Sequence, residues 1–446
     1  MPALFVHTDE QPLTWHQGEE VGVERFRSEL ERVAMGLPAA EYVFNLCNNR
    51  YRFMLGFGAA IRCRQITLMP PHMQPEVVTR VAEAYPKCCC LVDSPVEGIE
   101  LPQVRVDDLL QGRLTATPSF PEIPSDQTVA VVFTSGSTGE PKPIAKSWGG
   151  LVAEARGILD HLPFRARGVR SLVATGPPRG LYGLTSSVVL PWQAGFGIHP
   201  GQALFPLDVR DELAGPPAPR VLITTPRHLE DCASAGLDWP EIEFVVCATD
   251  PLERSLAAET EQRMKTEVYE LFGSTETGSI AGRRRVLDDD WQLYRGLSIT
   301  AEARVAWVQG NHLPDPTPIT DRVEIISPER FRLLGSDADL VNVAGKPASL
   351  MDLNHQLLSI SGVVDGVFVL PDDSGKEPQN LAALVVAPGL TKQQLFKALS
   401  AVVDASFLPR PLHLIDRLPR TATGKLPREQ VLKLLRMLNE AETPPG

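Results

Sequence analysis

Short runs of apolar, often β-branched residues recur along the first three-quarters of the chain, and helical stretches separate several of them. Apolar runs without alternating polar residues are typical of strands that are buried on both faces of a sheet. The runs are Thr128–Phe133, Ser171–Thr175, Val221–Thr224, Phe244–Ala248 and Val268–Leu271. Strands that alternate with helices in this way predict an α/β fold with buried sheets.

The composition of the chain changes near Gly335. Beyond that residue the pattern indicates a helix with Leu350, Leu353 and Leu357 on one face, and strands at 363–370 and 381–386. A second helix with Leu395 and Leu399 and a strand at 412–415 follow. These elements predict a small α+β unit of roughly 110 residues that can form an independent domain.

Length and charge limit the class of protein. A chain of 446 residues is too long for one compact core, so we expect two or three domains. The formal net charge of −12 argues against nucleic acid or an anionic membrane surface as a partner. No apolar run is long enough for a membrane span and no signal peptide is evident, so the protein is expected in the cytoplasm. The adjacent residues Cys88–Cys90 are expected to be reduced core thiols of a strand, because neighbouring strand residues point to opposite faces.

A segment rich in glycine and hydroxyl groups, Thr134–Pro143 (TSGSTGEPKP), follows the first apolar run and is expected to be irregular. Its two glycines allow backbone N–H groups to converge on an anion, and Lys142 adds positive charge. The spacing is not that of a Walker A loop. The segment predicts a phosphate-binding loop, with a surface turn as the alternative, and Ser147 is placed to cap the next helix. The candidate nucleotide-binding residues of the loop are Thr134, Ser135, Gly136, Ser137, Thr138, Gly139 and Lys142.

A second segment of this kind is Gly273–Gly278 (GSTETG), which follows the apolar run at Val268–Leu271. It carries one carboxylate, Glu276, and such a hard oxygen ligand can hold Mg²⁺ against the phosphates of a nucleotide. The alternative is a solvated glutamate in an exposed turn.

A third segment, LPRTATGKLP, lies near the C-terminus and places Lys425 between Pro419 and Pro427. A lysine held in such a loop can donate to a transferring phosphoryl group. A lysine that only adds surface charge is the alternative.

The three segments, in this order, resemble the motifs of the adenylate-forming superfamily, which includes acyl-CoA synthetases, luciferases and the adenylation domains of peptide synthetases. The resemblance extends from Thr128 to Leu435. It implies a large N-terminal α/β domain at 1–335, a hinge at 336–339 and a small C-terminal α+β lid at 340–446. It also implies ATP and Mg²⁺ as cofactors.

The resemblance assigns roles in phosphate chemistry. The loop Thr134–Lys142 would hold the β- and γ-phosphates, Glu276 would bind Mg²⁺, and Thr275 would contact the α-phosphate. Lys425 is similar to the lid lysine that adenylation requires. The implied reaction is attack of a substrate carboxylate on the α-phosphorus with loss of pyrophosphate, after which the lid rotates and exposes the acyl-adenylate to a thiol.

The resemblance also assigns the nucleoside and acyl sites. Thr249 and Asp250 would line the adenine pocket, and Asp321 would bind both ribose hydroxyls. The residues that would line the acyl pocket are Tyr182, Gly183, Thr224 and Gly273; for Tyr182, core packing is the alternative.

The chain departs from the family pattern at three positions. Ser336 stands where the family has an arginine that contacts ribose. Ala338 stands where a charged hinge residue is usual, with Asp337 or Asp339 as the alternative source of that charge. We expect these changes to weaken nucleotide binding without abolishing activity. Pro347 stands where relatives have a basic residue, in a segment that helps to form the thiol tunnel.

The segment Gly180–Leu184 contains no aspartate for an α-ammonium group, which disfavours an amino acid and favours an aryl or medium acyl acid. The short chain and the segments GSTETGSIAGRRR and GKPASL resemble short acid:carrier-protein ligases of secondary metabolism, from bacterial aryl-polyene and xanthomonadin-type pathways. The favoured acceptor is therefore the phosphopantetheine thiol of an acyl carrier protein, with CoA second. The run Arg283–Arg285 is interpreted as a solvated basic turn, with a docking site for an acidic carrier protein as the alternative.

Three classes of function remain open at this stage. They are an acid–thiol ligase, a non-catalytic relative that acts as a scaffold, and an amino-acid adenylation module. Release of pyrophosphate separates the first from the second, and dependence on an amino acid identifies the third.

Overall fold

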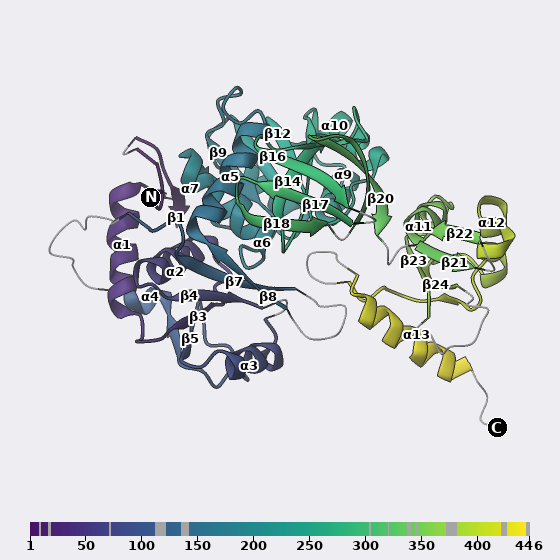
Figure 1. The fold of residues 1–446 in the computed structure, drawn as a ribbon, viewed down its shortest axis with the longest axis horizontal. Helices are drawn as coiled ribbons and strands as arrows, with labels where there is room; N and C mark the ends of the chain where they lie inside the picture. Colours follow the sequence, from purple (N-terminus) through teal and green to yellow (C-terminus); the bar gives the residue numbers. More distant parts are fainter. Residues whose placement is uncertain are drawn as a thin grey trace. The chain divides into compact units, whose positions relative to one another are not determined.

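The computed structural model (Figure 1) describes residues 1–8, 10–16, 19–70, 73–111, 122–134, 142–302, 305–319, 321–336, 340–343, 346–371, 381–420 and 426–442. Contacts divide the chain into two compact units. The first comprises Met1–Ala301, Trp307–Pro318 and Ile325–Phe331, and the second comprises Glu302–Ala306, Ile319–Glu324 and Arg332–Gly446. The predicted α/β class is confirmed. The boundaries at 335 and 340 stay a prediction, and most of the hinge, residues 337–339, lies outside the described residues.

The larger sheet has eleven strands among the described residues, in the order β19-β20-β15-β14-β13-β12-β11-β9-β10-β1-β2. Its parallel strands are β9 (Ser171–Ala174), β10 (Gly197–Ile198), β11 (Arg220–Thr224), β12 (Phe244–Cys247), β13 (Val268–Ser274) and β1 (Thr14–His16). The remaining strands are β2 (Glu19–Val21), β14 (Gly278–Arg284), β15 (Trp291–Leu293), β19 (Asp321–Ser327) and β20 (Arg330–Ser336). Four apolar runs that predicted strands therefore lie side by side as β9, β11, β12 and β13, and their carboxyl ends meet at one edge.

The second sheet has six strands among the described residues and contains the apolar run that precedes the predicted phosphate loop. In sheet order the strands are β6 (Gln103–Arg105), β5 (Cys88–Val92), β3 (Tyr42–Asn45), β4 (Ile66–Met69), β7 (Thr128–Thr134) and β8 (Lys142–Ser147). Cys88–Cys90 lie buried in β5 as predicted, and burial raises the pKa of Cys90 to about 12, so its thiol is protonated at neutral pH.

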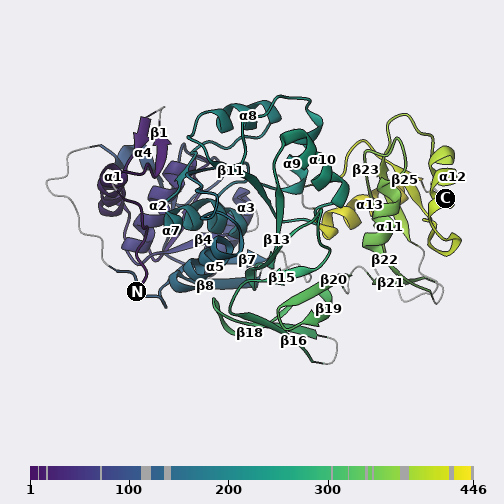
Figure 2. The same ribbon diagram turned by 90° about the horizontal axis from the view of Figure 1, so that it is seen from above.

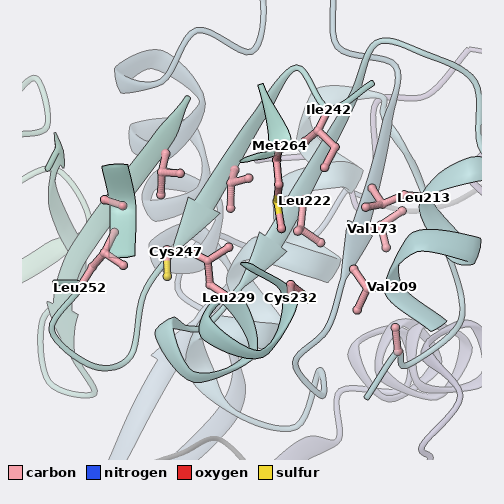
Figure 3. Close-up of a cluster of buried hydrophobic side chains, with 14 residues drawn as sticks. Val173, Val209, Leu213, Leu222, Leu229, Cys232, Ile242, Cys247, Leu252 and Met264 are labelled. Atoms are coloured by element: carbon pink, nitrogen blue, oxygen red, sulfur yellow. The ribbon is translucent and has the colours of Figure 1, made fainter. Parts of the chain in front are cut away.

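Helices cover both sheets. They are α1 (Val23–Gly36), α2 (Arg50–Arg62), α3 (Pro75–Ala84), α4 (Val106–Leu109), α5 (Trp148–His161), α6 (Leu181–Leu184), the π-helix η1 (Thr185–Val189), α7 (Leu190–Ala194), α8 (Pro206–Ala214), α9 (Pro226–Ser234) and α10 (Arg254–Met264). Figure 2 shows α8, α9 and α10 together beside β11 and β13. Figure 3 shows how apolar side chains of these helices, such as Leu213 and Leu229, pack against Leu222 and Val173 of the sheet.

Helix α5 forms as the sequence predicts. The side chain of Ser147 accepts a hydrogen bond from the backbone N–H of Gly150 at 3.1 Å, which satisfies one of the free donors of the first turn. Its predicted apolar face is buried, from Trp148 to Leu159. No helix in the described part of the chain is both long and apolar enough to span a bilayer.

A three-stranded sheet consists of β16 (Leu297–Glu302), β17 (Val305–Gly310) and β18 (Leu313–Ile319), and most of its residues belong to the first unit. The elements after Ser336 are β21 (Leu340–Val343), β22 (Lys346–Ser349), α11 (Leu350–Leu358), β23 (Asp365–Val369), β24 (Ala382–Val386), α12 (Lys392–Val402), the short 3₁₀ helix η2 (Ala405–Phe407), β25 (Leu412–Leu414) and α13 (Arg428–Glu442). The predicted order of helices and strands in the small α+β unit is therefore confirmed. Leu353, Leu357 and Leu395 are buried together in its core.

Candidate active site

The predicted phosphate loop connects two paired strands. β7 and β8 run antiparallel, and their pairing ends with Thr134 opposite Lys142. The segment Thr134–Pro143 was expected to be irregular throughout, and this is wrong at both ends, because Thr134 belongs to β7 and Lys142 to β8. The candidate residues Ser135, Gly136, Ser137, Thr138 and Gly139 lie outside the described residues. The loop therefore starts and ends at neighbouring backbones, with the exposed Lys142 at its base.

The second predicted loop is a tight hairpin turn between β13 and β14. The strands stay paired as far as Ser274 and Gly278, so that residues 275–277 form the tip. The backbone N–H of Ser274 donates to Thr277 Oγ1 at 2.9 Å, and the N–H of Thr277 donates to Ser274 Oγ at 3.2 Å. These bonds hold the turn that carries Thr275 and Glu276, as the sequence predicts.

The base of this turn requires glycine. A Cβ atom on Gly273 would collide with the carbonyl oxygen of Gly278, and Gly278 has a φ of +66°. Gly273 is therefore explained by close backbone approach, while its predicted place in the acyl pocket stays a prediction.

Glu276 is the predicted magnesium ligand and lies half-buried at the tip of the turn. Among the described residues no group of three or more His, Cys, Asp or Glu side chains can hold a metal ion. In nucleotide sites Mg²⁺ is usually held by one or two carboxylates together with substrate phosphates, and one carboxylate on a fixed turn suits that arrangement. Its role as a ligand stays a prediction.

The predicted adenine segment lies at the same edge of the larger sheet. Thr249 follows β12 by two residues and has a φ of +92°, which is unusual for a β-branched residue. Its hydroxyl donates to Asp250 Oδ2 at 3.1 Å. β12 lies between β11 and β13, so Thr249, Asp250, Thr224 and Gly273 all come from the carboxyl ends of adjacent strands.

Tyr182 and Thr224 of the predicted acyl pocket lie next to each other. The Tyr182 hydroxyl lies 3.3 Å from the carbonyl oxygen of Thr224 and 3.2 Å from that of Val246, to which it can donate. Burial raises the pKa of Tyr182 well above its usual value, so the hydroxyl stays protonated. The ring therefore lies across the ends of β11 and β12, and core packing and pocket lining are compatible roles for it.

A polar group beside Thr224 was missed by the sequence analysis. Thr175 Oγ1 lies 2.9 Å from Thr224 Oγ1 and 3.0 Å from Nδ1 of His228 on α9. Burial lowers the pKa of His228, which favours the neutral imidazole. The available signal was a threonine at the end of each of two apolar runs, Thr175 and Thr224.

Gly183 offers a test of the packing around Tyr182. A Cβ atom there would collide with the carbonyl oxygen of Pro177, so alanine at Gly183 should destabilise the protein by about 1–3 kcal/mol. Gly180→Ala is the matched control, because a Cβ atom there meets nothing within 4 Å. Urea unfolding followed by tryptophan fluorescence compares the two variants, and equal midpoints would contradict the collision.

The loop that precedes α6 is held by a buried arginine, Arg50, at the start of α2. Its guanidinium donates to the carbonyl oxygens of Ala174 (3.1 Å), Gly176 (2.6 Å), His199 (3.2 Å) and Gly201 (2.6 Å), and to Ser187 Oγ (3.1 Å). Burial lowers the pKa of Arg50 to about 10, so it remains charged at neutral pH. Arg50 thus connects the start of α2 to the carboxyl end of β9.

The interpretation of Arg283–Arg285 as a solvated basic turn is wrong. Arg283 and Arg284 are the last residues of β14, and each of the three has an acidic partner. The ion pairs are Arg283–Glu270 (2.7 Å), Arg284–Glu261 (2.7 Å), Arg284–Glu267 (2.7 Å) and Arg285–Asp289. This pairing removes the run as support for docking of an acidic carrier protein.

Two other predicted site residues are not among the described residues of the first unit. Asp321 is the first residue of β19 and belongs to the second unit, and Lys425 lies outside the described residues. Their roles stay predictions.

A family model and the sequences of known enzymes match about two-thirds of this chain or more. Residues 5–317 match the model of the AMP-binding enzyme family. The 4-coumarate–CoA ligase of Rhodobacter capsulatus is 30% identical over 312 residues, which cover 68% of this chain and 75% of the relative. The 3-hydroxybenzoate–CoA ligase of Aromatoleum sp. is 22% identical, over 74% of this chain and 71% of the relative.

Solved structures match nearly the whole chain. ATP-bound MatB from Rhodopseudomonas palustris has a TM-score of 0.81 at 16% identity and covers 96% of this chain and 97% of its own. The o-succinylbenzoate CoA synthetase MenE from Bacillus subtilis, in complex with AMP, has a TM-score of 0.79 at 16% identity, with coverage of 95% and 96%.

The two sheets, the hairpin loop after β7 and the carboxylate-bearing turn after β13 define the fold of an adenylate-forming enzyme. The chain belongs to the AMP-binding enzyme family and is an AMP-forming acid–thiol ligase. The resemblance to the superfamily is confirmed, whereas the closer likeness to carrier-protein ligases stays a prediction.

Proposed function

We propose that this enzyme uses ATP and Mg²⁺ to convert an aromatic or medium acyl acid into an acyl-adenylate and transfers the acyl group to a phosphopantetheine thiol. One contact carries the proposal. Nζ of Lys146, on the strand that ends the predicted phosphate loop, donates to the carbonyl oxygen of Glu276 at 3.3 Å. The β7–β8 hairpin and the Thr275–Glu276 turn are therefore neighbours, and one nucleotide can contact both.

In the first half-reaction an oxygen of the substrate carboxylate attacks the α-phosphorus, and the bond to the bridging oxygen of pyrophosphate breaks. The loop Thr134–Lys142 stabilises the departing β- and γ-phosphates, and the Thr275 hydroxyl donates to the α-phosphate. Lys425 donates to the charge that develops in the transition state. When bound at Glu276, Mg²⁺ supplies further neutralisation of phosphate charge.

A second set of residues holds the nucleoside. Thr249 and Asp250 line the adenine site, and Asp321 accepts hydrogen bonds from both ribose hydroxyls. Ser336 and Ala338 cannot supply the charged contacts that the family has at those positions, so we expect a raised KM for ATP.

In the second half-reaction the thiol attacks the acyl carbonyl, the bond to AMP breaks, and the thiol proton passes to solvent. The thiol belongs either to the phosphopantetheine of an acyl carrier protein or to CoA. The resemblance to short carrier-protein ligases supports an acyl carrier protein, and the names of the relatives, which are CoA ligases, support CoA.

The names of the relatives also support the substrate class. They specify 4-coumarate and 3-hydroxybenzoate, and a structural neighbour is described as an anthranilate CoA ligase. These acids are aromatic. Tyr182 and Thr224 would lie against the acyl group at the ends of β11 and β12.

The test is release of pyrophosphate from ATP over a panel of aryl, fatty and amino acids, with and without EDTA. We expect Mg²⁺-dependent release with one aryl or acyl class, and mass spectrometry then identifies thioester formed on CoA or on a phosphopantetheinylated carrier protein. Release that depends on an amino acid would indicate the adenylation-module alternative. Silence on every acid, together with no stabilisation by ATP, would refute the proposal and favour a non-catalytic scaffold.

A further inference from the structure

Three polar side chains from distant parts of the chain meet behind the Thr275–Glu276 turn. They are Lys146 on β8, Glu154 on α5 and His312 in the link between β17 and β18, and all belong to the first unit. Each binds a backbone group within the stretch 276–279. The sequence analysis assigned no role to any of them.

Two of the contacts are made to carbonyl acceptors of the turn and one to a backbone N–H donor just after it. Lys146 Nζ donates to the carbonyl oxygen of Glu276 at 3.3 Å, and His312 Nε2 lies 2.8 Å from the carbonyl oxygen of Thr277. Because a carbonyl can only accept, Nε2 of His312 carries the proton. Glu154 Oε1 accepts from the backbone N–H of Ser279 at 2.8 Å. The backbone of the tip and of the start of β14 is therefore held by groups outside the hairpin.

Glu154 is one of the buried carboxylates of the first unit. Its residue is 3% exposed, and a charged side chain is rarely buried without compensating partners. A Cβ atom on Gly278 would lie 2.6 Å from Glu154 Oε2, so the turn and the carboxylate are fitted closely to each other.

The charges of the three groups are coupled. Burial lowers the pKa of Lys146, while the carboxylates of Glu154 and Glu276 oppose that change. Burial also lowers the pKa of His312, with Glu154 acting in the opposite direction and Lys146 in the same one. Glu154 thus opposes the lowering of the pKa of both the lysine and the histidine beside the turn, and Glu276 adds to its effect on the lysine.

Lys146 also has a particular place in the chain. It lies four residues after Lys142, on the strand whose pairing with β7 closes the predicted phosphate loop. One hydrogen bond therefore links β8 to the backbone of Glu276. Because Glu276 itself bears the carboxylate predicted to face Mg²⁺, this bond ties that residue to the strand that follows the predicted phosphate loop.

We propose that Lys146, supported by Glu154 and His312, is a positioning residue for adenylation, which fixes the Thr275–Glu276 turn relative to the phosphate loop. This inference rests on the proposed function. A misplacement of about 1 Å at a reacting centre can reduce a rate by about 10²-fold. Because the turn is proposed to act on the phosphates during adenylation, loss of Lys146 should lower kcat of the first half-reaction. The second half-reaction does not need the β- and γ-phosphates and should be spared.

The test compares Lys146→Met, Lys146→Arg and the exposed control Lys87→Met in the full-length enzyme. We expect Lys146→Met to lower kcat for pyrophosphate release by about 10–100-fold, with little change in KM for the acid. Transfer from a supplied acyl-adenylate to the thiol should keep its wild-type rate. Lys146→Arg retains charge and donors and should restore most of the activity, and Lys87→Met should match the wild type.

His312→Gln and His312→Leu provide a second pair if Lys146→Met is poorly folded. Glutamine retains a donor for the Thr277 carbonyl. The His312→Gln enzyme should therefore release pyrophosphate faster than the His312→Leu enzyme, with the same thermal stability. Unchanged pyrophosphate release by Lys146→Met, or an equal loss in both half-reactions, would overturn the positioning role. Silence of the wild-type enzyme on every acid would instead refute the proposed function, and this inference with it.

Discussion

Replacement of Lys425 by alanine should lower acid-dependent pyrophosphate release by about 10²–10³-fold, which is the usual effect of removing one donor that stabilises transition-state charge. The lysine would act on the α-phosphate only while pyrophosphate leaves, so kcat should fall more than the affinity for ATP. A coupled pyrophosphate assay under saturating ATP measures the effect. Thermal unfolding should be unchanged, because the sequence predicts a loop for this lysine, between Pro419 and Pro427.

The control for this variant is Lys433→Ala, an exposed lysine on α13 in the same unit. It should release pyrophosphate at the wild-type rate. Transfer from a supplied acyl-adenylate should persist in Lys425→Ala, which separates the chemical role from a folding defect. Near-normal pyrophosphate release by Lys425→Ala would exclude the proposed mechanism.

Replacement of Arg50 by methionine should lower the free energy of unfolding by about 3 kcal/mol or more. The side chain is fully buried, and its loss would leave up to four backbone carbonyls without their donor, at about 1–3 kcal/mol for each buried group that stays unsatisfied. Methionine fills part of the volume but donates nothing. Urea unfolding with tryptophan fluorescence and circular dichroism measures the change.

Arg62→Met, on the last turn of the same helix, is the matched control. Arg62 is partly exposed and pairs with Glu31 at 3.5 Å, an interaction worth about 0–1 kcal/mol. If both substitutions shift the urea midpoint by the same amount, the network of Arg50 does not carry the stability ascribed to it.

The central strands could be predicted because the information is local. Short apolar runs rich in β-branched residues, such as Val221–Thr224 and Phe244–Ala248, favour a strand covered on both faces. Strand β8 was missed because Pro143 and two lysines argue against a strand. It is the edge strand of the six-stranded sheet, and an edge tolerates proline because one side of the strand needs no hydrogen-bonded partner.

The supports of the site could not be predicted in this way. Lys146 and Glu276 are separated by 130 residues, and neither has a neighbour in sequence that indicates the contact. In the sequence, Arg50 is an ordinary charged residue at the start of a helix. Its partners at the end of β9 and in residues 199–201 surround it only in the folded protein. The same holds for Arg283, whose partner Glu270 belongs to the preceding strand.

The strand order of the larger sheet also determines when its N-terminal strands can pair during synthesis. Strand β1 joins it through β10, with Thr14 opposite Ile198 and the Thr14 hydroxyl donating to the Ile198 carbonyl at 2.6 Å. A ribosome that adds about 5–20 residues per second completes β10 about 10–40 s after β1. During that interval β1 and β2 have no place in the sheet. The earliest residues of the chain can therefore join the larger sheet only after β9 and β10 have been made.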